Sequence, residues 1–207
     1  MVVTGMSYPA FAFYRQDRKD YYSNPWRMKG CKLIEPYSGD DRYMEFTNVI
    51  GFQGKYYAIS RQGSLALIED EGNSGNFEIT ALGRHRVVPQ CKVSRHFREY
   101  LLEYNGDIYL VFLLSRASIN VVDDVEVFRL DRARLVWEKV DRLIGDAMFF
   151  VEDKCCLGIS ASLIGCSRGN CVYFTHDRAD DTWFVFDMNT SSISTTSGPE
   201  IDLSDSE

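Results

Sequence analysis

The chain has 207 residues, of which 45% are hydrophobic and 14% aromatic, and this composition predicts a folded domain with a substantial core. Its formal net charge of −7 argues against a nucleic-acid binder held by phosphate contacts and favours an unknown protein partner. The longest apolar run, residues 108–114, is far shorter than the roughly 20 residues that cross a bilayer, and residues 1–9 lack a secretory pattern. We therefore expect a cytoplasmic or nuclear protein with no nucleic-acid or membrane partner and six reduced cysteines.

The first half of the chain contains two segments that read as parts of β-sheets. Residues 8–36, with the apolar run at 10–14, indicate the end of one sheet. Residues 45–82 indicate a second sheet, in which Gln53-Gly54 and Gln62-Gly63 mark turns. Apolar residues come in unbroken runs, which is typical of strands covered on both faces. The short polar gaps between the runs favour antiparallel hairpins over parallel strands, which need long crossovers.

Residues 97–141 contain the clearest turn signal of the chain. Asn105-Gly106 separates two apolar runs, and this dipeptide readily takes the positive φ angles of a two-residue type I′ hairpin. The apolar residues between positions 93 and 104 also fall at helical spacing. We predict a hairpin, with a helix over this stretch as the alternative.

Residues 145–188 complete the pattern, and the composition changes after them. From Asn189 onward the chain is rich in Ser, Thr and acidic residues and has no Lys or Arg. Such a segment has too few apolar groups to offset the entropy of ordering. We therefore predict a β-propeller-like domain over residues 1–188 and a disordered acidic tail over 189–207.

One unit recurs along the chain: a glycine turn, a short aromatic strand, and an apolar strand that ends in Glu69, Asp131 or Asp187. Repetition on a period of roughly 50 residues is typical of propellers and arrays. The fold predicted is all-β, a partial or small β-propeller of antiparallel meander blades, with about three blades and part of a fourth. Closed propellers carry about 4 to 8 blades, so this would be an arc or a minimal ring. An arc exposes apolar blade faces, through which we expect self-association.

Two motifs in the second half of the chain point to a family. The first runs from Leu143-Ile144-Gly145-Asp146 to Phe150, after Val127–Asp131 and Trp137, and the second is Gly169–Thr175. Together they resemble the plant F-box-associated β-propeller family. In that family an N-terminal F-box docks onto a ubiquitin ligase and the propeller captures the protein to be ubiquitinated.

The resemblance covers only part of the family's plan. It implies the C-terminal portion of the propeller, and nothing before Ala10 can supply an F-box. Ligase docking is therefore not expected of this polypeptide. The expected function is a non-catalytic protein-interaction module that resembles the substrate-capturing propeller. An inactive truncated remnant is one alternative.

A second alternative is a metal-binding or enzymatic protein that uses Cys166, Cys171 and His176, since soft ligands of this kind bind zinc. If residues 171–176 form a strand, five steps of about 3.3 Å separate its ends too far for one shared ion. No phosphate-binding glycine motif is present either. We expect no catalytic residue, no metal and no cofactor, with the thiols packed as small apolar groups.

A basic stretch stands out against the acidic whole. Its side chains could grip an acidic or phosphorylated partner through forked guanidinium contacts. The alternative is a solvated loop between blades, since loops are generally polar and lie at the surface. The predicted partner-binding residues are Arg84, His85, Arg86, Arg95 and Arg98.

Overall fold

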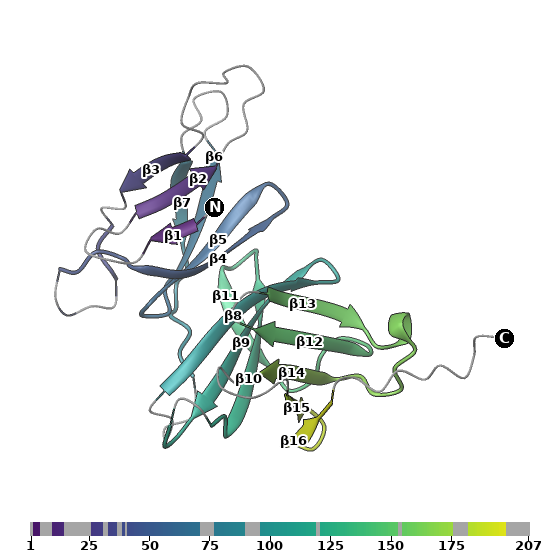
Figure 1. The fold of residues 1–207 in the computed structure, drawn as a ribbon. Helices are drawn as coiled ribbons and strands as arrows, with labels where there is room; N and C mark the ends of the chain where they lie inside the picture. The colour runs from purple at the N-terminus through teal and green to yellow at the C-terminus, as the bar shows by residue number, and fades with distance from the viewer. Residues whose placement is uncertain are drawn as a thin grey trace. The chain divides into compact units, whose positions relative to one another are not determined.

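The computed structural model describes residues 2–4, 10–14, 26–30, 33–36, 39, 41–70, 77–89, 96–118, 121–152, 155–175 and 182–197. Within these residues the chain is all-β, and the one helical element is a 3-10 turn at Ser162–Ile164 (Figure 1). By its contacts the chain divides into two units. Unit 1 comprises Met1–Val88 and Asp131–Val136, and unit 2 comprises Pro89–Leu130 and Trp137–Glu207.

Unit 1 contains two antiparallel sheets. The first has three strands in the order β1-β2-β3, namely β1 (Val2–Thr4), β2 (Ala10–Tyr14) and β3 (Trp26–Gly30). The second has four strands in sequence order, namely β4 (Phe46–Phe52), β5 (Lys55–Ser60), β6 (Leu65–Asp70) and β7 (Phe77–Leu82). Each sheet falls within one of the first two predicted segments, apart from β1, which precedes residue 8.

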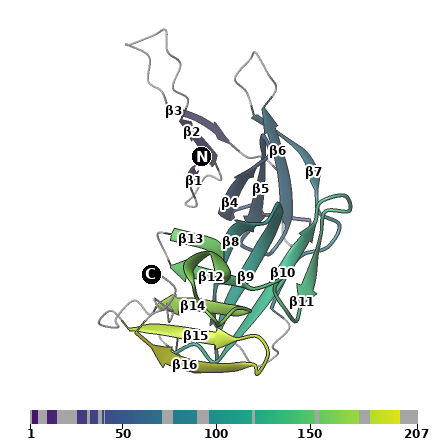
Figure 2. The same ribbon diagram turned by 90° about the vertical axis from the view of Figure 1, so that its right-hand side faces the viewer.

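Unit 2 contains most of the other two sheets. One is a four-stranded antiparallel meander of β8 (His96–Tyr104), β9 (Asp107–Ser115), β10 (Asp124–Asp131) and β11 (Val136–Val140). The other has five strands in the order β13-β12-β14-β15-β16 (Figure 2). These are β12 (Ala147–Glu152), β13 (Cys155–Ser160), β14 (Cys171–Thr175), β15 (Trp183–Asp187) and β16 (Ser192–Thr196). The all-β fold class and the partial propeller are thus confirmed.

The predicted hairpin at Asn105-Gly106 is present, and the helical alternative is wrong. Tyr104 pairs with Asp107, and the two residues between them have φ angles of 51° and 79°, as a type I′ turn requires. Gln53-Gly54 forms a second such turn, with φ angles of 49° and 78°. The preference of Asn-Gly for a tight turn therefore outweighs the helical spacing of the apolar residues that precede it.

Two of the three acidic strand ends of the repeat, Asp131 and Asp187, have a structural role in the turn that follows each strand. The carboxylate of Asp131 accepts hydrogen bonds from the backbone N–H groups two and three residues later, at 3.0 and 3.1 Å. Asp187 does the same at 2.8 and 3.4 Å. Four residues after each Asp the backbone turns left-handed, at Leu135 (φ 54°) and Ser191 (φ 51°). The two turns have the same geometry. In each, the Asp side chain accepts the backbone hydrogen bonds that open the turn, in place of a backbone carbonyl.

The prediction of antiparallel meanders throughout is wrong for the last sheet. β14 pairs in parallel with β12, from Met148↔Cys171 to Val151↔Phe174. Neighbouring parallel strands need a connection of a dozen or more residues. β13 and the turn-rich segment 161–170 supply that connection, so β13 is added as an extra edge strand.

The boundary predicted for the disordered tail at Asn189 is also wrong. Residues 189–191 complete the Asp187 turn, and β16 then pairs along the whole of β15. Backbone pairing orders this Ser/Thr-rich strand although none of its residues is fully buried. The predicted tail beyond position 197 lies outside the described residues.

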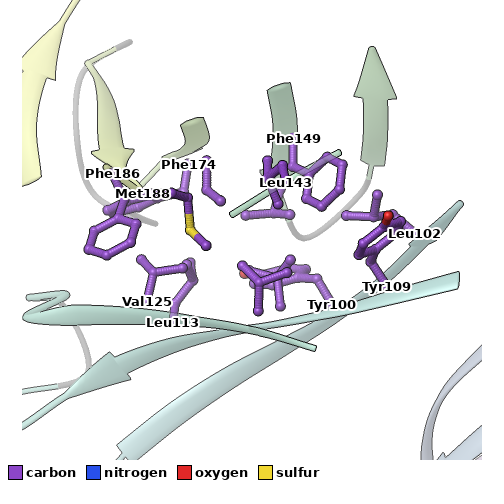
Figure 3. Close-up of a cluster of buried hydrophobic side chains, with 14 of the residues drawn as sticks. Tyr100, Leu102, Tyr109, Leu113, Val125, Leu143, Phe149, Phe174, Phe186 and Met188 are labelled. Atoms are coloured by element: carbon purple, nitrogen blue, oxygen red, sulfur yellow. The ribbon is translucent and has the colours of Figure 1, made fainter. Parts of the chain in front are cut away.

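The main core of unit 2 lies between the two sheets (Figure 3). Tyr100, Tyr109 and Leu113 come from one sheet, and Phe149 and Phe174 come from the other. All of them are buried, and the Phe149 and Phe174 side chains have 0% exposure. In β9 every residue from position 108 to 115 is buried, so the strand is covered on both faces, as the unbroken apolar run predicts.

Candidate interaction sites

Residues 84–86, which we call the basic segment, follow β7 and expose three side chains. The segment is fixed at both ends. The N–H of Gly83 donates to the carbonyl of Leu65 (2.7 Å), and the N–H of Val87 donates to that of Gly63 (2.9 Å). A Cβ on Gly63 would lie 1.9 Å from the Val87 carbonyl oxygen, so this approach requires glycine. The basic segment is therefore held against β6 and the β5–β6 turn while its side chains face outward.

The predicted partner-binding residues divide between the two units. Arg84, His85 and Arg86 lie in unit 1 and form the basic segment. Arg98 lies on β8 in unit 2, is half-buried, and donates a 3.4 Å hydrogen bond to the carbonyl of Thr175. Arg98 thus has a structural contact that links β8 to β14. The predicted residue Arg95 lies outside the described residues.

Cys166 and Cys171 are buried in one apolar cluster on the face of the five-stranded sheet. Their thiols donate to the carbonyl oxygens of Arg168 (3.6 Å) and Gly169 (3.3 Å). Burial raises the pKa of the Cys171 thiol to about 11, which disfavours the thiolate that metal binding and nucleophilic attack need. The third predicted member of this set, His176, lies outside the described residues. Among the residues that are described, no group of three or more His, Cys, Asp or Glu side chains is placed to hold a metal ion.

Asp146 closes the turn that follows β13. Its carboxylate accepts from the Ser160 hydroxyl (2.8 and 2.9 Å) and from the backbone N–H of Ser162 (2.7 Å). These bonds, with the Ser162 N–H first, lower the pKa of the Asp146 carboxyl to about 2. A Cβ on Gly169 would lie 2.7 Å from Asp146 Cα, so the second motif approaches the first closely. The acidic group of the first motif is therefore used to fix a loop.

Asn170 connects three segments of unit 2. Its side-chain Oδ1 accepts from the buried N–H of Leu143 (2.7 Å), and its Nδ2 donates to Oδ1 of Asn189 (2.7 Å). Its backbone N–H donates to the Ala147 carbonyl (2.7 Å), and its own carbonyl accepts from the N–H of Met188 (3.0 Å). The side chain is 5% exposed, and φ is 59°. The motif asparagine is thus a structural residue that ties β12, β14 and the β15–β16 turn together.

A polar hollow of about 500 Å³, which no sequence motif predicts, lies in unit 1 beside the β5–β6 turn. One wall comes from residues 35, 42, 43 and 45, beside the antiparallel bridge between Ile34 and Tyr43. The other wall is the turn that follows β5. The lining residues are Glu35, Arg42, Tyr43, Glu45, Arg61 and Gln62.

Glu35 is the unusual residue of this hollow. Its side chain is only 2% exposed, and the hydroxyl of Ser64 donates a hydrogen bond to its Oε1. Its backbone N–H donates to the Arg42 carbonyl (2.7 Å) and fixes the bridge. Buried carboxylates are rare unless they are paired. In the sequence, the burial of Glu35 is indicated only by its apolar neighbours Leu33, Ile34 and Pro36.

Sheets of three to five strands, built mainly from antiparallel hairpins, are typical of a β-propeller domain. The chain belongs to the KIB1-4 beta-propeller family, whose family model matches residues 1–187. This confirms the resemblance that the two motifs carried, because the family is a propeller family of the plant F-box-associated type. Searches of the curated proteins and of the solved structures found no match. In the part of the chain that the structure describes, no helix is long and apolar enough to span a membrane.

Proposed function

We propose that this chain is a non-catalytic module that captures a protein partner, as the substrate-capturing propeller of plant F-box proteins does. Membership of a β-propeller family supports an interaction module in general. The motif residues Asp146 and Asn170 are engaged in internal hydrogen bonds, so contacts with a partner are left to the connections between strands. We further propose that the protein acts in the cytoplasm or nucleus.

The basic segment is the proposed point of contact with an acidic or phosphorylated stretch of the partner. The observation that carries this proposal is a cluster of exposed cationic side chains, anchored at both ends, on a chain of net charge −7. Arginine presents a planar fork of donors that matches carboxylate and phosphate geometry. Because the backbone is already fixed, little loop entropy is lost when a partner binds.

The test removes the charges without touching the anchors. Replacing Arg84, His85 and Arg86 by serine should weaken capture of the partner by about tenfold or more, because hydrogen bonds to charged groups are lost. The free energy of unfolding should change by only about 0.5 kcal/mol, since the substituted side chains lie at the surface. Capture is measured by proximity labelling in plant cells with the full chain, and stability by urea unfolding.

A matched control removes the same formal charge elsewhere. The double variant Arg116→Ser and Arg142→Ser changes two exposed arginines and should keep the labelled partners. Equal labelling by the wild type and the basic-segment variant would refute the contact. Equal loss in both variants would show a general charge effect and would refute it as well.

A further inference from the structure

The Glu35 carboxylate has more hydrogen-bonding capacity than the chain uses. An ionised carboxylate offers two oxygens with about four acceptor sites. Within the described part of the chain, Ser64 is the one residue that donates to this carboxylate, and no lysine or arginine forms an ion pair with it. Glu35 nevertheless lines the hollow, although its side chain is only 2% exposed.

The other charged groups of the hollow already have partners. Arg61 Nη1 lies 3.5 Å from Oε2 of Glu45, and both side chains are well exposed. Arg42 also has an interaction within the chain. Both arginines of the hollow thus have contacts within the chain. Glu35 is the most buried of the lining residues, and among the described residues its carboxylate has no ion-pair partner.

We propose that this hollow receives a lysine or arginine side chain of the captured protein, with the cationic end at Glu35. An isolated buried carboxylate is stabilised by an opposite charge that donates hydrogen bonds to it. Tyr43, which lines the hollow and is 53% exposed, offers an aromatic surface for the stem or the cation of that side chain. A volume of about 500 Å³ lies in the usual range of small-ligand sites and leaves room for the neighbouring peptide group.

This inference rests on the proposed function only in that the ligand is part of a protein. The site itself differs from the basic segment, because the chemistry is reversed: a buried anion receives a cation here, whereas exposed cations receive an anion there. A partner that used both would carry a basic residue and an acidic stretch. Each contact can be tested without the other.

The probe is N-acetyl-lysine methylamide, titrated into the 15N-labelled full chain and followed by amide chemical shifts. We expect saturable shifts at the residues that line the hollow, Arg61 and Gln62 among them. N-acetyl-norleucine methylamide, which has the stem without the charge, should bind at least about tenfold more weakly. Absence of saturable shifts with the lysine probe, or equal binding of the norleucine probe, would overturn the proposal.

Two variants place the binding at Glu35. Glu35→Gln keeps an acceptor for Ser64 and should weaken the lysine probe by about tenfold or more. Glu78→Gln removes the same formal charge from an exposed position on β7 and should have no effect. Unchanged binding to Glu35→Gln, or preferential binding of N-acetyl-aspartate methylamide, would count against the proposal. If Glu35→Gln does not fold, the lysine–norleucine comparison in the wild type still decides the question.

The same titration separates this proposal from the first one. The basic-segment serine variant should bind the lysine probe as the wild type does. Probe binding without any effect of that variant on partner capture would leave the Glu35 site standing and refute the basic-segment contact. Loss of capture in that variant, with no probe binding in the wild type, would do the reverse.

Discussion

Replacing Phe149 by alanine should lower the free energy of unfolding by about 3–5 kcal/mol, measured by urea denaturation. The Phe149 side chain is fully buried between the two sheets of unit 2. Its ring centroid lies 5.0 Å from that of Tyr109 and 5.9 Å from that of Tyr104. The substitution removes these contacts and leaves a cavity between the two packed sheets, which cannot easily move together to close it.

A matched control for Phe149 lies on the next strand. Leu157 on β13 pairs with Phe150 and is 51% exposed, so Leu157→Ala should change stability by only about 0.5 kcal/mol. If Phe149→Ala cost no more than Leu157→Ala, the two sheets would not share a packed core.

Replacing Asn170 by alanine should cost about 2–4 kcal/mol. The change leaves the buried N–H of Leu143 without its acceptor and removes the bond to Asn189. It also places a Cβ-bearing residue without a polar side chain at a φ of 59°, where asparagine is better tolerated. Urea unfolding of the full chain measures the loss.

Two further substitutions separate the causes at this position. Asn170→Gly relieves the backbone strain and should recover only the smaller part of the loss, because the Leu143 N–H is still unsatisfied. Asn170→Asp keeps an acceptor for Leu143 and should be milder than alanine. Full recovery in the glycine variant would show that the side-chain hydrogen bonds contribute nothing.

Local chemistry made much of the fold predictable from the sequence. Asn105-Gly106 determines a hairpin because few other dipeptides tolerate two consecutive positive φ angles. The repeated Asp131 and Asp187 mark strand ends because their carboxylates accept the hydrogen bonds of the following turn. Unbroken apolar runs such as residues 108–114 require cover on both faces of a sheet. Each of these signals depends only on residues that are close together in the sequence.

The failures of prediction are long-range pairings. β14 pairs in parallel with β12 after a loop that Asp146 holds through a hydrogen bond from Ser162, a residue distant from it in the sequence. Nothing in the spacing of the two strands distinguishes this path from a meander. The sequence does not predict β16, because backbone hydrogen bonds to β15 hold this strand in place. The polar side chains of residues 192–196 give no sign of that pairing.

The candidate sites divide in the same way. The basic segment is visible in the sequence because its three charged or titratable residues are adjacent, and the structure shows that all three are exposed. Its role in partner binding stays a prediction. Arg98 was grouped with that segment by proximity in sequence, whereas its guanidinium contacts Thr175. Beyond its apolar neighbours, Glu35 carries no recognisable sequence signal, because the contact that holds its buried carboxylate comes from Ser64, which is distant in the chain. A buried acid in a loop is recognisable only when that packing is known.

Strands that are buried on both faces and paired on both sides should be the most rigid parts of the chain, and partner contacts then fall to the connections between strands. Hydrogen–deuterium exchange of the full chain measures this rigidity strand by strand. Amides of β9, which is paired on both sides and buried from position 108 to 115, should exchange most slowly. Amides of the edge strand β16 should exchange much faster. Exchange in β9 as fast as in β16 would show that burial and pairing on both sides do not make β9 rigid.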